Sequence, residues 1–312
     1  MRTRRLGRTG LEISVAGFGA WATGGSWKYG LGTQDDAESI AAIHRALELG
    51  VNWIDTAAVY GYGHSEEVVA LALRGSAERP YLFTKCGLLE GPGGEVLRSL
   101  ARESIRSECE ASLRRLGVDA IDLYQIHWPI PDEDVEEGWA ALAELKAEGK
   151  VRHIGVSNFD VGQLQRVEAI APVESLQPPY SLIERGVEEK TLPWCAEHDV
   201  GVIVYSPMAS GLLGGSMTRE RIAAFGEGDM RRTTPAFLEL EVSRNLELAD
   251  RLRTIGERRG VSPGAVAVAW TLRRPEVTAA IVGFRRPAQV DGILPAATEL
   301  ELSDEELAEL ER

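Results

Sequence analysis

The chain has 312 residues, of which 44% are hydrophobic and 26% are charged, and its formal net charge is −14. No stretch approaches the roughly 20 apolar residues of a membrane helix, and the arginines form short, scattered pairs rather than the positive patch that binds nucleic acid. We therefore expect neither a membrane nor a nucleic-acid partner. The basic N-terminus lacks the apolar core of a signal peptide, and Cys86, Cys109 and Cys195 are odd in number and widely spaced, which favours a cytoplasmic location.

Short β-rich runs alternate with amphipathic, helix-like stretches along the chain. Near the start, RRLGRT and LEIS flank Thr9 and Gly10 and predict a small hairpin. Strands are then expected, in chain order, at SVAGFG, NWIDTA, YLFTKC, IDLYQIHW, VRHIGVSN, ESLQPPY, VGVIVYSP and AAIVGF. Helices are expected at residues 35–49, 65–73, 96–116, 133–148, 161–170, 188–198, 238–259 and 263–273, with one more at the C-terminus.

The repetition of strand and helix defines the expected fold class. Parallel strands need a helical crossover, so repeated βα units predict a parallel sheet. Eight such units in a chain of this length predict a closed (β/α)8 TIM barrel that forms a single domain over residues 1–312. The alternative is an open doubly wound sheet, which usually carries GxGxxG after its first strand, and no such motif follows SVAGFGAW.

The segment between the seventh and eighth strands does not fit this repeat. Residues 207–237 contain several glycines and are too many for an ordinary connection. Long loops in compact domains are usually lids or binding loops. We expect such a loop after strand 7, with disorder as the alternative.

Four polar residues stand at the ends of consecutive predicted strands. Asp55 ends the second strand and Tyr60 lies in the loop that follows it, whereas Lys85 ends the third strand and His127 the fourth. The catalytic face of a barrel lies at the carboxyl ends of its strands, and neighbouring strands are about 4.8 Å apart. The four side chains should therefore meet.

A phenol, an amine, a carboxylate and an imidazole at one place suit proton delivery to a carbonyl. The ordinary pKa of tyrosine, about 10, makes it a poor acid at neutral pH, and a nearby ammonium lowers that pKa. We expect Lys85 to lower the pKa of Tyr60, and Asp55 to hold Lys85 charged and oriented. His127 would then donate a hydrogen bond to the carbonyl oxygen.

Other interpretations of these residues stay open. Each of the four alone also fits a structural role, such as a capping carboxylate or a core histidine. A barrel lysine can also form a Schiff base with a carbonyl substrate, as in aldolases, with Lys85 as the candidate. The five histidines form no HExxH or i, i+4 pair and have no cysteine nearby, so we expect no metal. GxSxG and a complete phosphate loop are absent from the sequence.

The ordered series DTAAVYGYGHSE, FTKC, DLYQIHWP, GVSNF, LQPPYSL and YSPMASGLLGG resembles the aldo-keto reductases of the longer bacterial type. The resemblance covers nearly the whole chain. It implies a barrel plugged by the N-terminal hairpin and an NAD(P)H-dependent enzyme that interconverts carbonyl compounds and alcohols. It also implies that Asp55, Tyr60, Lys85 and His127 are the catalytic tetrad, with Tyr60 as the proton donor.

The same resemblance implies a set of cofactor contacts. The nicotinamide carboxamide would be bound by Ser157, Asn158 and Gln177, and the nicotinamide ring would stack on Tyr205. The pyrophosphate would be wrapped by Ser206, Met208 and Gly211, beneath the long loop. The 2′-phosphate of NADP would be held in the region of Gly283, Arg285, Arg286 and Gln289. The two arginines favour NADPH, with NADH as the alternative. Gly292 and Ile293 depart from the family, which often has a Glu-Asn pair there to bind adenine.

The resemblance says less about the substrate. Trp21, Trp27 and Trp128 stand in or beside segments that form the aromatic walls of the substrate pocket, although tryptophans are also common core residues. Indole walls favour apolar or flat carbonyl substrates. Some members of this group are cofactor-binding regulatory subunits of membrane channels with little turnover, and that role is the alternative function. The physiological substrate, the preferred direction of reaction and the oligomeric state stay open.

Overall fold

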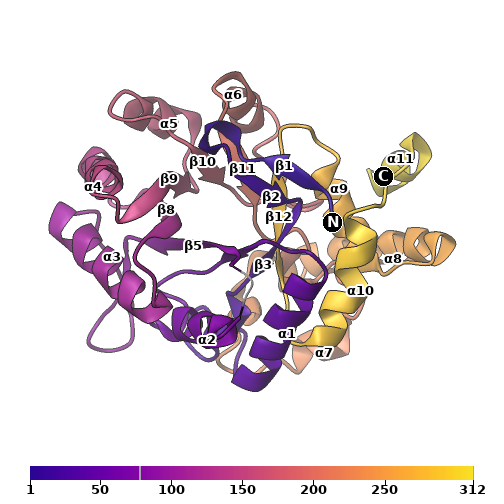
Figure 1. Ribbon diagram of the computed structural model, residues 1–312. Helices are drawn as coiled ribbons and strands as arrows, with labels where there is room; N and C mark the ends of the chain where they lie inside the picture. The colour runs from indigo at the N-terminus through magenta and orange to yellow at the C-terminus, as the bar shows by residue number, and fades with distance from the viewer. Residues whose placement is uncertain (77–78, 312) are drawn as a thin grey trace.

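The computed structural model describes residues 1–76 and 79–311. Its centre is a closed barrel of eight parallel strands, surrounded by helices (Figure 1). In order around the barrel, the strands are β10 (Ser175–Gln177), β11 (Gly201–Val204), β12 (Ala279–Gly283), β3 (Ala16–Gly19), β4 (Trp53–Asp55), β5 (Tyr81–Cys86), β8 (Ile121–Ile126) and β9 (Val151–Ser157). Each lies within a predicted strand, so the predicted (β/α)8 barrel is confirmed.

The helices lie outside the barrel (Figure 1), and their buried apolar residues share one core with those of the strands. They are α1 (Asp36–Glu48), α2 (His64–Leu73), α3 (Arg102–Leu116), α4 (Val135–Ala147), α5 (Val161–Glu168), α6 (Thr191–Glu197), α8 (Glu241–Arg259), α9 (Pro263–Leu272), α10 (Pro287–Ala297) and α11 (Asp304–Leu310). Within residues 1–76 and 79–311, no helix combines the length and the apolar character that crossing a bilayer requires.

The N-terminal hairpin closes one end of the barrel, as predicted. β1 (Thr3–Arg5) pairs antiparallel with β2 (Glu12–Ser14). Leu6 and Ile13 are fully buried and pack with inward-facing strand residues such as Trp53 and Phe83. Gly17 makes room for this packing, because a side chain there would overlap the Trp53 indole, whose atoms lie 2.2 Å from an ideal Cβ.

The prediction of a helix from residue 96 was wrong at its N-terminal end. β7 (Val96–Arg98) pairs antiparallel with β6 (Leu88–Glu90), and α3 begins only at Arg102. Leu88 and Val96 are buried in a small cluster with the partly buried Tyr60. Burial of Leu88 and Val96 stabilises the hairpin more than helix propensity would stabilise a helix there. The hairpin packs against the loop that carries Tyr60.

The long segment after β11 is folded into short helical pieces. These are η4 (Ala209–Gly211), α7 (Arg219–Ala223), η5 (Met230–Thr233) and η6 (Pro235–Phe237). Asp229 forms a β-bridge with Leu31, and the N–H of Met230 donates to the carbonyl of Gly30 at 3.2 Å. The segment therefore reaches from β11 past β12 to the loop that follows β3.

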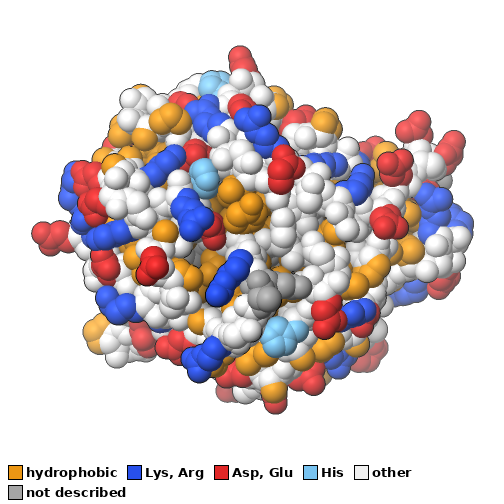
Figure 2. Space-filling model, viewed as in Figure 1, with side chains coloured by type: hydrophobic (Ala, Val, Ile, Leu, Met, Phe, Trp, Pro, Cys, Tyr) orange, Lys and Arg blue, Asp and Glu red, His pale blue; other side chains and the backbone are white. Residues whose placement is uncertain are grey.

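Charged side chains of both signs are interspersed on the face of the molecule shown in Figure 2. Most ion pairs of the described residues join exposed or half-exposed side chains, such as Arg166 with Asp132 at 2.8 Å. Pairs of this kind contribute little to stability. The ion pair of Lys85 and Asp55 differs from these pairs because both side chains are buried, and it lies in the candidate site.

Candidate active site

A buried ion pair stands at the carboxyl end of the barrel. Lys85 of β5 and Asp55 of β4 are 1% and 3% exposed. The Lys85 ammonium donates to Asp55 Oδ1 at 2.6 Å and to the carbonyl of Thr56 at 2.9 Å. Since β4 and β5 are adjacent parallel strands, their pairing sets both side chains at the same end of the barrel.

Tyr60 and His127 complete a cluster around this pair. The Lys85 ammonium lies 3.4 Å from the Tyr60 hydroxyl, to which it donates, and 5.1 Å from the centre of the ring. The rings of Tyr60 and His127 are 5.6 Å apart and nearly perpendicular, at 78°. The structure thus brings together all four residues that the sequence places at the strand ends.

The expectation of a lowered pKa for Tyr60 was wrong. Burial, with a smaller contribution from the negative charge of Asp55, raises the pKa of Tyr60 well above its ordinary value. The reason is that Asp55 offsets the positive charge of Lys85, so desolvation of the phenolate dominates. Tyr60 is therefore a neutral phenol at neutral pH, and it holds a proton to give.

The neighbouring groups are also shifted by burial. Burial lowers the pKa of Lys85, while the charges of Asp55 and Glu66 raise it in part. Burial and the Lys85 charge hold the pKa of His127 well below its ordinary value. His127 is therefore a neutral imidazole at neutral pH, with one N–H to donate and one nitrogen to accept.

Gln177 lies beneath the cluster and contacts a residue that the sequence did not connect to it. Its side-chain amide donates to Asp55 Oδ2 at 2.8 Å, and the residue is 2% exposed. Gln125 of β8, fully buried beside it, was missed because an amide inside a strand has no sequence signal of its own. With its N–H groups turned to Asp55, Gln177 can offer its carbonyl oxygen to the amide of a nicotinamide.

Asn158 links three strand ends. Its amide donates to the carbonyl of His127 at 2.9 Å and to Ser157 Oγ at 3.0 Å, and its oxygen accepts from the Tyr205 hydroxyl at 2.8 Å. Its φ of 65° is left-handed, a conformation that asparagine tolerates. Ser157, Asn158 and Tyr205 therefore lie together, next to His127.

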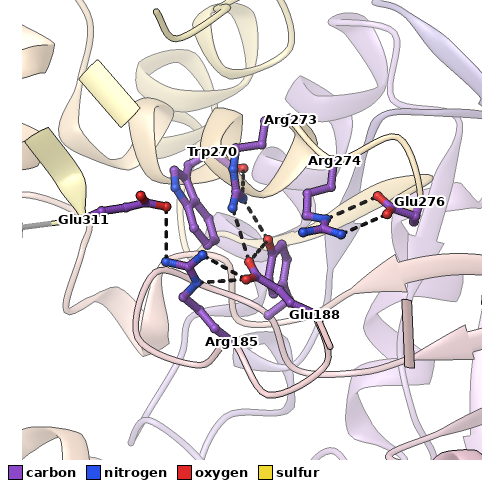
Figure 3. A network of polar contacts seen from close by, with 8 residues as sticks. Arg185, Glu188, Trp270, Arg273, Arg274, Glu276 and Glu311 are labelled. Carbon is purple, nitrogen blue, oxygen red and sulfur yellow. Dashed lines mark hydrogen bonds and ion pairs between the residues drawn. The ribbon is translucent and has the colours of Figure 1, made fainter. Parts of the chain in front are cut away.

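A network of hydrogen bonds and ion pairs holds the loop after β10 (Figure 3). Glu188 accepts from the Tyr180 hydroxyl at 2.6 Å and from the guanidinium groups of Arg185 and Arg273. The N–H of Tyr180 donates to the carbonyl of Tyr205 at 3.1 Å. This network connects the segment that follows Gln177 to α9 and holds the backbone of Tyr205.

The segment proposed for the pyrophosphate lies against an arginine of the long loop. Ser206 has a φ of 56° and Gly211 a φ of 89°. An ideal Cβ at Gly211 would lie 3.9 Å from a guanidinium nitrogen of Arg231. Arg231 is buried, paired with both carboxylate oxygens of Asp229, and it donates to the carbonyl of Ser210 at 3.4 Å. Sequence reasoning missed Arg231 because nothing in its spacing connects it to residue 211.

Arg285 follows β12, near Arg231. Its Nε donates to Gln34 Oε1 at 2.6 Å, its guanidinium also donates to the carbonyl of Thr33, and its own N–H donates to Gln289 Oε1 at 2.8 Å. Burial, and next the charge of Arg231, lower the pKa of Arg285, and Arg286 adds to this effect. Gly283 and Arg286 are exposed beside it. These guanidinium groups repel one another, and an anion would relieve that repulsion.

The polar groups near these strand ends fit a nicotinamide dinucleotide. Amide and hydroxyl groups lie at the tetrad end, at Asn158, Ser157 and Gln177, and guanidinium groups lie at Arg231 and Arg285. A carboxamide needs the first kind of partner and phosphates need the second. No group of His, Cys, Asp or Glu suited to hold a metal ion occurs within the described residues.

The tryptophans differ in their relation to the tetrad. The Trp27 ring lies 5.8 Å from the Tyr60 ring and also contacts Tyr29 and Tyr62. Trp128 directly follows His127 and is 40% exposed. Trp21 is partly buried at the start of a short helical turn, η2 (Ala22–Gly24). Trp27 therefore lies beside Tyr60, whereas Trp128 is half-exposed next to His127.

A (β/α)8 barrel with a phenol, an ammonium, a carboxylate and an imidazole clustered at its strand ends is suited to proton transfer at a carbonyl oxygen. The chain belongs to the aldo/keto reductase family, whose model matches residues 16–312. It is thus an NAD(P)H-dependent oxidoreductase that acts on carbonyl or alcohol groups.

Two relatives match nearly the whole chain. Aldo-keto reductase YhdN of Bacillus subtilis (strain 168) is 38% identical over 297 residues, which are 94% of this chain and 88% of the relative. The NADH-specific methylglyoxal reductase of Escherichia coli (strain K12) is 33% identical over 319 residues, with 97% and 95% covered. Among solved structures, the glycerol dehydrogenase AKR11B4 from Gluconobacter oxydans is similar with a TM-score of 0.89, 37% identity, and coverage of 99% and 94%.

Proposed function

We propose that the chain reduces aldehydes or ketones to alcohols with NADPH, and that Tyr60 is the proton donor. The observation that carries this proposal is the placement of the Lys85 ammonium, 3.4 Å from the Tyr60 hydroxyl and held by Asp55 and Thr56. As Tyr60 releases its proton, the hydrogen bond from Lys85 stabilises the phenolate that forms.

The tetrad residues divide the work of protonating the carbonyl oxygen. NADPH, when bound, supplies the hydride that adds to the carbonyl carbon. Tyr60 delivers the proton to the oxygen, and the neutral imidazole of His127 donates a hydrogen bond that orients the same oxygen. Asp55 keeps Lys85 charged in a buried site, and Gln177 holds Asp55 in turn. Oxidation of an alcohol would run the same steps backwards.

The aromatic residues beside Tyr60 support an apolar or flat substrate. Trp27, Tyr29 and Tyr62 form a group of aromatic rings next to Tyr60, with Leu88 and Val96 behind it. Such a wall excludes water from the reacting carbonyl and contacts a flat or apolar substituent.

Replacement of the proton donor tests the assigned chemistry. We expect Tyr60→Phe to lower kcat by about a hundredfold or more, because general acid catalysis contributes 10²–10⁴-fold, while NADPH still binds. Turnover is measured with a panel of aldehydes and NADPH, and binding by quenching of tryptophan fluorescence. Tyr81→Phe, the same change at the other end of β5, serves as the control. Full activity in Tyr60→Phe would show that another group delivers the proton.

The arginines after β12 support NADPH over NADH. We expect Arg285→Ala to lower kcat/KM for NADPH by about tenfold to a hundredfold, since a hydrogen bond to a charged group is worth 1.5–3 kcal/mol. The value for NADH should stay unchanged, so that cofactor is the internal control. Because the methylglyoxal reductase relative is NADH-specific, equal losses with both cofactors would point to a general structural effect and against a 2′-phosphate site.

A further inference from the structure

Residues in the first turn of α2 form hydrogen bonds near the carboxyl ends of β3, β4 and β5, the strands around the Lys85–Asp55 ion pair. Ser65 Oγ donates to the carbonyl of Ala20, which follows β3, at 2.8 Å. Because that donation uses its only hydrogen, Ser65 Oγ accepts from Thr56 Oγ1, also at 2.8 Å. Thr56 follows Asp55, and its carbonyl receives the Lys85 ammonium. All these polar groups are buried.

The next residue of the helix holds the neighbouring strand. Glu66 is fully buried, and its Oε1 accepts from Thr84 Oγ1 at 2.6 Å. Its Oε2 accepts from Arg115 Nε of α3 at 2.6 Å. Thr84 precedes Lys85 in β5, so the alternation of side chains along a strand turns Thr84 outward to α2 and Lys85 inward to the site.

The same turn also holds the loop that carries Tyr60. The N–H of Ser65 donates to the carbonyl of Tyr60 at 3.2 Å. The phenol, the lysine and the aspartate therefore share one support, although they come from a loop and two strands. The hydrogen bond between the Lys85 ammonium and the Tyr60 hydroxyl is long, at 3.4 Å. A shift of a few tenths of an ångström there separates a hydrogen bond from none.

We propose that Ser65 and Glu66 form a positioning clamp that sets the distance between Lys85 and Tyr60 by gripping Thr56 and Thr84. The clamp rests on the proposed function of Tyr60 as proton donor and names further residues on which that function depends. Neither residue touches the reacting atoms, so they are positioning residues rather than catalytic ones. The negative charge of Glu66 also acts on Lys85 directly, since it helps to raise the pKa of that lysine.

A pair of substitutions at Thr84 separates positioning from general stability. Thr84→Val removes the hydroxyl that donates to Glu66 and keeps the volume, whereas Thr84→Ser keeps the hydroxyl. The hydride-transfer rate is measured in single turnover with a reactive aldehyde, using NADPH and NADPH deuterated at the transferred position. We expect Thr84→Val to slow this step by about tenfold to a hundredfold, the loss typical of a displaced reacting group, with NADPH affinity unchanged and the isotope effect intact.

Glu66→Gln should slow the same step, and the matched control is Glu67→Gln, the same change at an exposed position of the same turn. Thr84→Ser and Glu67→Gln should keep the wild-type rate. Wild-type rates in Thr84→Val would overturn the clamp, and so would equal losses in Thr84→Ser and Thr84→Val that follow their melting temperatures. Glu66→Gln can fail to fold because Arg115 loses its ion-pair partner. In that case, the comparison of Thr84→Val with Thr84→Ser still tests the clamp.

A failure of the proposed function would be visible separately. If the wild type consumes no NADPH with any aldehyde, the assignment of Tyr60 fails, and the clamp is judged by crystallography. The distance between Lys85 Nζ and Tyr60 Oη in Thr84→Val should then exceed that in the wild type. An unchanged distance would overturn the clamp without reference to activity.

Discussion

Glu108 of α3 is a buried carboxyl that the proposed mechanism does not use. It is 5% exposed, and its Oε2 accepts from the N–H of Gly87, two residues after Lys85, at 2.9 Å. Ser104 Oγ donates to its other oxygen at 3.2 Å. Burial raises the pKa of Glu108 from 4.5 to about 8, so it is largely protonated at neutral pH.

This shift predicts how stability depends on pH. Between 4.5 and about 8, the folded protein binds a proton on Glu108 that the unfolded chain has released. Stability should therefore fall as pH rises through that window, by up to about 1.4 kcal/mol per pH unit. Glu108→Gln keeps an acceptor for Gly87 and cannot ionise, so we expect it to be increasingly more stable than the wild type from pH 5 to pH 8.

Urea unfolding at several pH values measures this difference. Glu103→Gln, an exposed carboxylate on the same helix, is the control and should follow the wild type. A constant difference between Glu108→Gln and the wild type across the window would mean that Glu108 is ionised in the folded protein.

At this scale, the sequence could predict which residues meet but not the electrostatic field between them. Asp55, Lys85 and His127 stand at or just after strand ends, so strand order brings them together, and Tyr60 follows in the loop after β4. Whether Lys85 lowers the pKa of Tyr60 depends on how fully Asp55 offsets its charge and on how much water reaches the phenol. Both depend on packing that no local spacing encodes.

Among the elements, the strands were predicted better than their connections. A buried parallel strand shows as a continuous apolar run, and each of the eight was found in this way. The β6–β7 hairpin was missed because Val96 and Leu100 have the spacing of a helix as well, and only the contacts of Leu88 and Val96 with the Tyr60 loop decide between the two.

The structure of the long segment after β11 was also only partly predictable from the sequence. Its length predicted a lid or binding loop, and the structure gives it an apolar core of Leu212, Met217 and Phe237. The bridge from Asp229 to Leu31 and the approach of Arg231 to Gly211 join residues far apart in the chain. The bridge to Leu31 follows from the closed barrel, which places the end of β3 next to the end of β12.

In the whole molecule, the two ends of the barrel have different tasks. The carboxyl ends of the strands carry the candidate site, and the opposite end is closed by the N-terminal hairpin. There Leu6 and Ile13 extend the apolar interior of the barrel. In barrels generally, the first end serves chemistry and the second serves stability.

This division gives a prediction about the plug. Leu6 is fully buried against the interior cluster, and truncation there leaves a cavity that the rigid barrel fills only in part. We expect Leu6→Ala to lower the free energy of unfolding by about 2–5 kcal/mol, while kcat and KM of the folded enzyme stay at wild-type values. Urea unfolding and steady-state kinetics with NADPH below the unfolding transition measure the two effects. A fall in kcat without loss of stability would show that the plug and the tetrad are coupled through the barrel interior, against the separation of the two ends.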